Sequence, residues 1–289
     1  MILRPQGLMA LAFFAATMAA STPPAATAQT VAIRAETVHT MTGPPIADGV
    51  IVIREGKIER VGPASETPVP EGVRLLTAKV ATPGLVDAHT VVGLAGYLNQ
   101  PHDQDQLERS APLQPQLRAI DAYNAQEALV AWLRGFGVTT IHTGHGPGAL
   151  VSGQTMVAKT RGATVEEAVV LPLAMIAANL GPAALAEKEK SPGTRAKQMA
   201  MLRSALIRAD EYRQKLAAAK EGERPSRDLE LEALASVLDR KIPLLVTVNR
   251  SQDIVSALRL AAEFAIRIVL DGAAESYLLV DEIRRAGVP

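Results

Sequence analysis

The order of apolar and polar residues changes near residue 82 and divides the chain into two parts. Residues 31–80 hold short runs rich in valine and isoleucine, separated by turns such as Gly43-Pro44-Pro45. Short β-branched runs with this punctuation predict a small antiparallel β unit. After Pro83-Gly84, apolar strand-like runs alternate with amphipathic helix-like stretches. This alternation predicts parallel strands joined by helices, in a doubly wound sheet or an eight-fold barrel.

The second part of the chain contains alternating predicted strands and helices. The strands cover residues 85–90, 137–143, 155–159, 168–176, 242–249 and 266–271. The helices cover residues 125–134, 194–220, 227–239, 253–264 and 275–286. A closed barrel of this type needs about eight strands, and residues 287–289 have the character of a turn into another strand. We therefore expect the barrel to be incomplete in this chain.

The first residues have the features of an export signal. Arg4 supplies a positive start, residues 8–20 form an apolar run, and residues 26–28 are small, as at a cleavage site. The apolar run is shorter than a comfortable membrane span, and no later run reaches that length. We predict a signal peptide over residues 1–28 and an exported, periplasmic or extracellular protein without membrane attachment after its removal. An uncleaved anchor is the alternative.

Composition removes several functional classes. The chain has 289 residues, 48% of them hydrophobic, and a formal net charge of zero. Binding to nucleic acid or to an anionic membrane would call for a basic surplus, and the aromatic content of 3% argues against base stacking. Because cysteine is absent, disulfides and thiol catalysis are excluded. We expect a small-molecule substrate or ligand as the partner, and a homo- or hetero-oligomer stays open.

Polar residues stand where the predicted strands end. In a parallel α/β fold the active-site groups gather at the carboxyl ends of strands, so these residues are the first candidates for chemistry. They are Asp87, His89 and Thr90 after the first strand, His142 and His145 after the second, Lys159 after the third, Thr247 and Asn249 after the fifth, and Asp271 after the sixth.

The segment Thr82-Pro83-Gly84-Leu85-Val86-Asp87-Ala88-His89-Thr90 resembles the first barrel strand of the amidohydrolase superfamily. Residues 153–159, 242–254 and 269–275 resemble later strands of its imidazolonepropionase-like branch, and residues 48–62 resemble its N-terminal β-sandwich. The resemblance implies a (β/α)8 TIM-type barrel over residues 81–289 and part of a β-sandwich over residues 29–80. It covers nearly all of the chain after residue 28.

The resemblance also implies a function, the metal-dependent hydrolysis of C–N bonds in a cyclic amide or a similar small polar substrate. In that family histidines and a carboxylate hold one or two divalent ions, usually zinc, which activate water. His89 matches a family ligand, but Val91 stands where a second histidine is expected. Thr247 and Asp271 replace the histidines of the fifth and sixth strands, and the eighth-strand aspartate falls beyond Pro289. The ligand motifs are therefore degenerate.

Two interpretations of these residues remain open. In the first, a re-built metal site forms around His89, His142 and His145, because adjacent strands bring their ends together. Asp271 and Lys159 would serve catalysis, with Lys159 either carbamylated or paired with a carboxylate such as Asp271. The residues expected to face the substrate are His102, Asp103, Thr247, Asn249 and Arg250.

In the second interpretation the protein is a pseudoenzyme. It would be a periplasmic binding or scaffold relative that partners an active paralogue, and the histidines would make structural hydrogen bonds.

Overall fold

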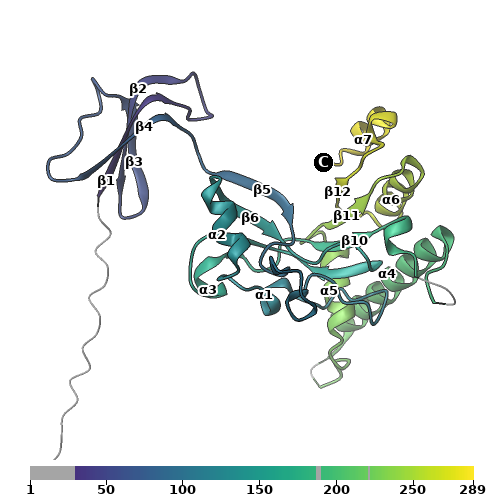
Figure 1. The fold of residues 1–289 in the computed structure, drawn as a ribbon. Helices are drawn as coiled ribbons and strands as arrows, with labels where there is room; N and C mark the ends of the chain where they lie inside the picture. Colours follow the sequence, from purple (N-terminus) through teal and green to yellow (C-terminus); the bar gives the residue numbers. More distant parts are fainter. Residues whose placement is uncertain (1–29, 187–189, 221) are drawn as a thin grey trace, which may run out of the picture. The chain divides into compact units, whose positions relative to one another are not determined.

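The computed structural model describes residues 30–186, 190–220 and 222–289. The predicted signal peptide lies outside the described residues. The chain divides into two compact units, Met1–Pro83 and Gly84–Pro289, a boundary close to the one predicted at residue 80. Each unit is described by itself (Figure 1).

The first unit is a four-stranded sheet in the order β3-β2-β1-β4. Its strands are β1 (Val31–Val38), β2 (Ile46–Arg54), β3 (Lys57–Pro63) and β4 (Arg74–Ala81). Glu55 and Gly56 both have positive φ, as the tight turn between β2 and β3 requires. Two neighbouring pairs are antiparallel, as predicted, whereas β4 runs parallel to β1. The described residues form one sheet, so the β-sandwich stays a prediction.

The second unit contains two further four-stranded sheets, in the orders β5-β6-β8-β9 and β12-β11-β10-β7. The first sheet consists of β5 (Leu85–Thr90), β6 (Val138–Thr143), β8 (Met156–Lys159) and β9 (Val169–Leu171). The second consists of β7 (Val151–Gln154), β10 (Ile176–Asn179), β11 (Leu244–Val248) and β12 (Ile268–Gly272). Strand pairing is parallel for β5 with β6 and for β10, β11 and β12.

One extended segment joins these two sheets. β7 and β8 follow each other in the chain with only Thr155 between them. β7 pairs with β10 and β8 pairs with β6, both antiparallel. The backbone N–H and C=O of Thr155 bond to the 174–175 stretch just before β10. The second unit is thus a single curved run of strands, from β5 through residues 151–159 to β12.

The structure corrects the predicted strands of the barrel in two respects. The strand predicted at residues 155–159 is present, but its predicted parallel direction is wrong. The strand predicted at residues 168–176 is replaced by a helical turn, α3 (Val165–Ala168), followed by β9 and, after a short connection, β10. The barrel was expected to be incomplete, and the residues that the structure describes form open sheets and no closed (β/α)8 barrel.

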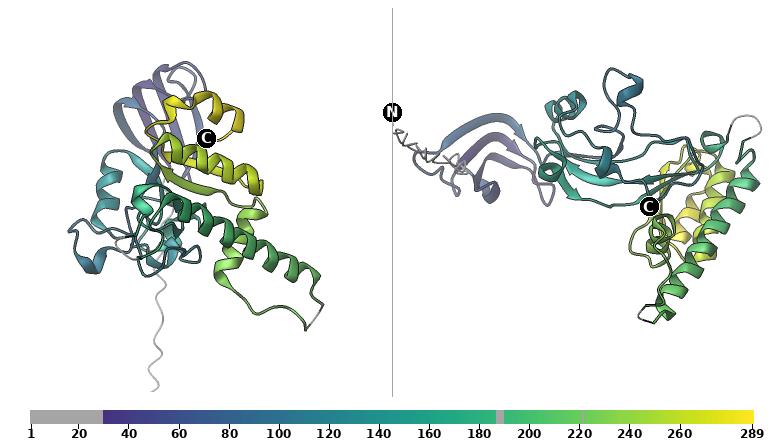
Figure 2. Two further views of the ribbon diagram at one scale, coloured as in Figure 1. Left: turned by 90° about the vertical axis from the view of Figure 1, so that its right-hand side faces the viewer. Right: turned by 90° about the horizontal axis from the view of Figure 1, so that it is seen from below.

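Helices pack against both sheets. α4 (Arg195–Ala218), α5 (Leu229–Leu238), α6 (Ser251–Phe264) and the short α7 (Val280–Ala286) pack with the sheet that contains β10, β11 and β12. The short helices α1 (Ala119–Ala122) and α2 (Ala128–Gly135) pack with the sheet that contains β5 and β6. α4 begins where the Thr194 hydroxyl accepts a bond from the Lys197 amide, a normal N-cap. Figure 2 shows α4 and α6 side by side.

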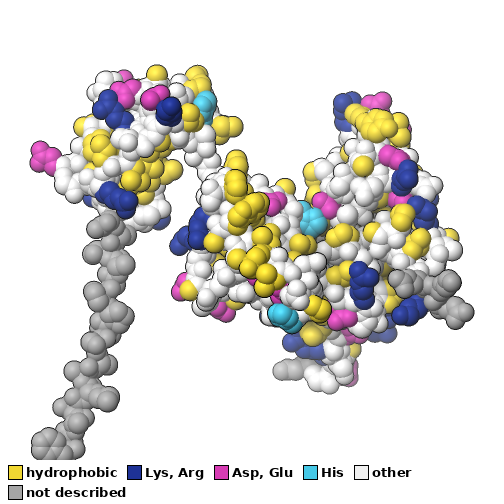
Figure 3. Space-filling model, in the orientation of Figure 1, with side chains coloured by type: hydrophobic (Ala, Val, Ile, Leu, Met, Phe, Trp, Pro, Cys, Tyr) yellow, Lys and Arg dark blue, Asp and Glu magenta, His cyan; other side chains and the backbone are white. Residues whose placement is uncertain are grey.

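Two apolar cores hold the second unit together. The larger core joins Leu206 of α4 and Ile254 of α6 to Leu244 and Val246 of β11. A smaller one, around Ile141 of β6, fixes the sheet that carries β5 and β6. No helix in the described parts of the chain is long and apolar enough to cross a membrane. On the face shown in Figure 3, side chains of both charge signs are interspersed.

Candidate functional site

The centre of the candidate site is a contact between the two ends of the curved strand run. His89 lies near the end of β5 and Asp271 near the end of β12. The His89 Nδ1 lies 3.0 Å from Asp271 Oδ2, and the two side chains are only 16% and 23% exposed. Thr247 is opposite Asp271 in the β11–β12 register, and its hydroxyl donates to the same Oδ2 at 2.7 Å. Three predicted site residues therefore meet here.

The charge state of this cluster follows from its hydrogen bonds. The pKa of Asp271 is lowered, chiefly by the hydrogen bond from His89, with Thr247 helping and burial opposing. An ionised carboxylate can only accept hydrogen bonds, so His89 donates from Nδ1. The other ring nitrogen, Nε2, is buried and has no hydrogen-bond partner in the described residues. It is the one uncommitted polar atom that His89 presents.

His142 lies beside His89, with ring centroids 5.9 Å apart, but both of its nitrogens have partners. Nδ1 lies 2.8 Å from the Ala88 carbonyl oxygen, and Nε2 lies 2.6 Å from the Thr155 hydroxyl. Since a carbonyl only accepts, Nδ1 carries the proton and Nε2 accepts from Thr155. Burial lowers the pKa of His142, which favours this neutral form. His142 thus ties β6 to β5 and to the segment that joins the sheets.

His145 is buried as well, at 5% exposure. Its ring lies against Gly153 of β7, and neither ring nitrogen has a hydrogen-bond partner in the described residues. Burial lowers the pKa of His145, an effect that the nearby backbone of Leu117 opposes. The convergence of His89, His142 and His145 on one ion stays a prediction, and in the described residues no three His, Asp or Glu side chains are placed to hold a metal.

The ligand atoms at the carboxyl ends of β5 and β12 do not fit the expected zinc ion. Such an ion needs three protein ligands and one open position in a catalytic site. Both nitrogens of His142 and Nδ1 of His89 are committed to protein partners. Asp271 Oδ2 already accepts from two donors, and Val91 offers no ligand atom. The groups left at this place are one imidazole nitrogen, His89 Nε2, and the second oxygen of Asp271, which are fewer than three protein ligands.

The other predicted site residues have separate partners. Lys159 donates to the Thr140 hydroxyl at 2.8 Å, so the expected pairing with Asp271 is not formed in the described residues. Arg250 pairs with Glu275 at 2.9 Å, on the surface. Asp103 accepts from Gln104, and His102 lies in the same helical turn, Pro101–Asp103. Asn249 follows β11 next to Gly272. That His102, Asp103, Asn249 and Arg250 face a substrate stays a prediction.

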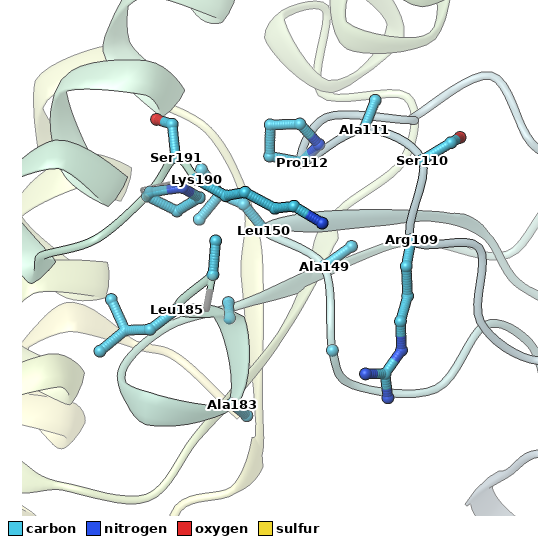
Figure 4. A pocket seen from close by; sticks show the side chains of 14 residues that line it. Arg109, Ser110, Ala111, Pro112, Ala149, Leu150, Ala183, Leu185, Lys190 and Ser191 are labelled. Atoms are coloured by element: carbon cyan, nitrogen blue, oxygen red, sulfur yellow. The ribbon is translucent and has the colours of Figure 1, made fainter. Parts of the chain in front are cut away.

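A pocket of about 550 Å³ opens elsewhere in the same unit. Figure 4 shows that its lining comes from separate stretches of chain, including Arg109, Leu150, Leu185 and Lys190. None of the predicted site residues lines it. Sequence reasoning missed this pocket because no local motif marks residues that meet only after folding. It also missed Thr155, which stands between two short strands and carries no recognisable motif.

Comparisons with known proteins place this geometry in a fold family. No family model and no curated protein matches the chain. Among solved structures, an amidohydrolase from Thermotoga maritima is 27% identical, with a TM-score of 0.83, over 90% of this chain and 68% of that one.

More distant matches include molinate hydrolase, 16% identical with a TM-score of 0.41 over 84% of this chain and 58% of that one. Another is an N-acyl-D-glutamate deacylase from Bordetella bronchiseptica complexed with zinc and a phosphonate inhibitor, 15% identical with a TM-score of 0.36 over 90% and 57%. The Thermotoga maritima match shows that the chain is similar in fold to an amidohydrolase.

Proposed function

We propose that this chain belongs to the amidohydrolase superfamily and hydrolyses a C–N bond in a small polar substrate. The observation that carries the proposal is the match to the Thermotoga maritima amidohydrolase, at 27% identity and a TM-score of 0.83 over 90% of this chain. The polar groups of His89, Thr247 and Asp271 gather at the carboxyl ends of β5, β11 and β12. Active sites of barrel enzymes occupy this place.

The finer assignment, to the imidazolonepropionase-like branch with a cyclic amide as substrate, rests on the resemblance of residues 82–90 and 153–159. The chain's own groups offer one means of handling a proton. Asp271 and Thr247 fix the His89 ring, so that Nε2 would accept a hydrogen bond from a water or a substrate N–H, as a general base does. Because the donor set does not fit a metal ion, no step is assigned to one.

A second candidate function is a non-catalytic binding or scaffold relative. It is favoured by the lack of a three-ligand group within residues 30–186, 190–220 and 222–289, since the expected reaction depends on such a group. Export to the periplasm or the outside of the cell, and assembly into a homo- or hetero-oligomer with an active paralogue, belong to this proposal as well.

An amine-release assay tests the first function. The full-length protein is incubated with panels of N-acyl amino acids, dipeptides and cyclic amides, and the freed amine is measured. We expect turnover with one panel and, in His89→Gln, a fall of about 10²–10⁴-fold, as for a lost general base. The matched control is His39→Gln, in the first unit. Turnover that survives His89→Gln unchanged would refute the role of His89. Stoichiometric binding of a panel member without turnover would favour the second function.

A further inference from the structure

The two edge strands of the curved run in the second unit are held together by side chains. β5 begins the run and β12 ends it, and the described strands include no ladder between the two (Figure 1). Yet His89 of β5 and Asp271 of β12 are 3.0 Å apart. The carboxyl ends of these strands therefore meet through a side-chain hydrogen bond, at the place where the fold family holds its metal.

We propose that His89, Thr247 and Asp271 form a metal-free clasp, which takes the place of a divalent metal centre and fastens β5 to β12. The comparison with a metal centre rests on the proposed superfamily membership, whereas the contacts belong to this chain alone. In a metal centre, a cation would bind both His89 and a carboxylate and so join the ends of β5 and β12. Here the carboxylate itself supplies the negative charge and the two acceptor positions that His89 and Thr247 use.

Replacement of histidine by aspartate explains the change of chemistry. With a histidine at position 271, two imidazoles would face each other and could hold a cation between them, because neutral imidazoles bind metals through free nitrogens. Asp271 instead accepts directly from His89, and Thr247 donates its hydroxyl to the same oxygen at 2.7 Å. A threonine hydroxyl is a poor zinc ligand but a good hydrogen-bond donor to a carboxylate. Thr247 and Asp271, at the two positions where histidines are expected, therefore both favour hydrogen bonding over metal binding.

The neighbouring histidine reinforces the clasp instead of competing for a metal. His142 donates from Nδ1 to the Ala88 carbonyl and accepts at Nε2 from the Thr155 hydroxyl. Recruiting it to an ion would break a bond to the backbone just before His89 or leave Thr155 to its weaker contact with the Met175 carbonyl, at 3.3 Å. Losing a hydrogen-bond partner in a buried place is costly. The buried network therefore opposes metal entry from the β6 side as well.

Zinc titration and imidazole spectroscopy of the full-length protein test the clasp without any activity readout. We expect calorimetric titration with zinc chloride to show no saturable one-to-one binding at micromolar concentration. We expect ¹⁵N–¹H spectra to place the His89 proton on Nδ1, protected from exchange, and to be unchanged by zinc or by a chelator.

Two results would overturn the proposal. One is stoichiometric zinc binding that His89→Gln abolishes while His39→Gln retains it. The other is a wild-type spectrum with the His89 proton on Nε2, which needs no variant to fold. Absence of hydrolysis in the amine-release assay would defeat the proposed function and leave these results standing, because neither measurement depends on turnover.

Discussion

Replacing Asp271 by asparagine removes the charge of the clasp and keeps its shape. Oδ2 of Asp271 accepts from His89 at 3.0 Å and from Thr247 at 2.7 Å. Hydrogen bonds to charged groups contribute roughly 1.5–3 kcal/mol, but the asparagine carbonyl keeps an acceptor in place. The side chains are also partly exposed, which screens the charge. We expect a loss of about 1–2 kcal/mol in the free energy of unfolding, or about 2–8 °C in Tm for a unit of this size.

Urea and thermal unfolding, followed by circular dichroism, measure this loss. The control is Asp281→Asn, which removes a carboxylate that is 79% exposed and pairs with Arg284 at 3.2 Å. The control should stay within about 0.5 kcal/mol of the wild type, as surface changes do. If Asp271→Asn and Asp281→Asn have equal stability, the clasp contributes nothing, and the account of how β5 and β12 are joined is refuted.

Three further predictions concern pH and packing. The pKa of Asp271 is lowered in the fold, so the stabilisation by its carboxylate is present above the unfolded pKa of about 4 and is lost as pH falls through the folded pKa. In urea unfolding, the difference in stability between the wild type and Asp271→Asn should therefore shrink below about pH 4. A difference that widens there would contradict this. Gly153 has a φ of +141° and a Cβ there would overlap His145, so Gly153→Ala should lower Tm in a thermal melt, and an unchanged Tm would show the two residues apart. Leu206→Ala, in the large core, should lower the free energy of unfolding by about 2–5 kcal/mol in urea. The control Ile207→Ala, at a side chain that is 49% exposed, should lower it clearly less. Equal losses would show that Leu206 is not a core residue.

Much of the second unit could be predicted from the sequence. The strand predicted at residues 85–90 is β5 with the same bounds, and the helix predicted at residues 194–220 is α4, Arg195–Ala218. These elements carry strong local signals, namely apolar residues directly after Pro83-Gly84 and a long stretch of helix-forming residues after Thr194, although Leu85 and Val86 are exposed in the structure. The strand-end rule likewise put His89, Thr247 and Asp271 among the candidates, and the fold brings them together.

The features that the sequence did not predict depend on contacts distant in the chain. An apolar run shows that a strand is buried but not its direction, so the antiparallel pairing of residues 151–159 was not foreseen. The hydrogen-bond partners of the histidines depend on distant contacts as well. Closeness of strand ends says nothing about which partner each ring nitrogen takes, and His142 takes the Ala88 carbonyl and the Thr155 hydroxyl. The pocket near Arg109 and Lys190 gave no sequence signal at all.

The central claim is that hydrogen bonds of His89 and Thr247 to Asp271 join β5 to β12, at the place where a metal ion is expected in the proposed superfamily. Elemental analysis of the full-length protein, purified from a zinc-supplemented culture and dialysed without chelator, tests it most directly. The account predicts divalent metal far below one equivalent per chain, in the wild type and in His89→Gln alike. One equivalent of zinc in the wild type that is lost from His89→Gln would contradict it.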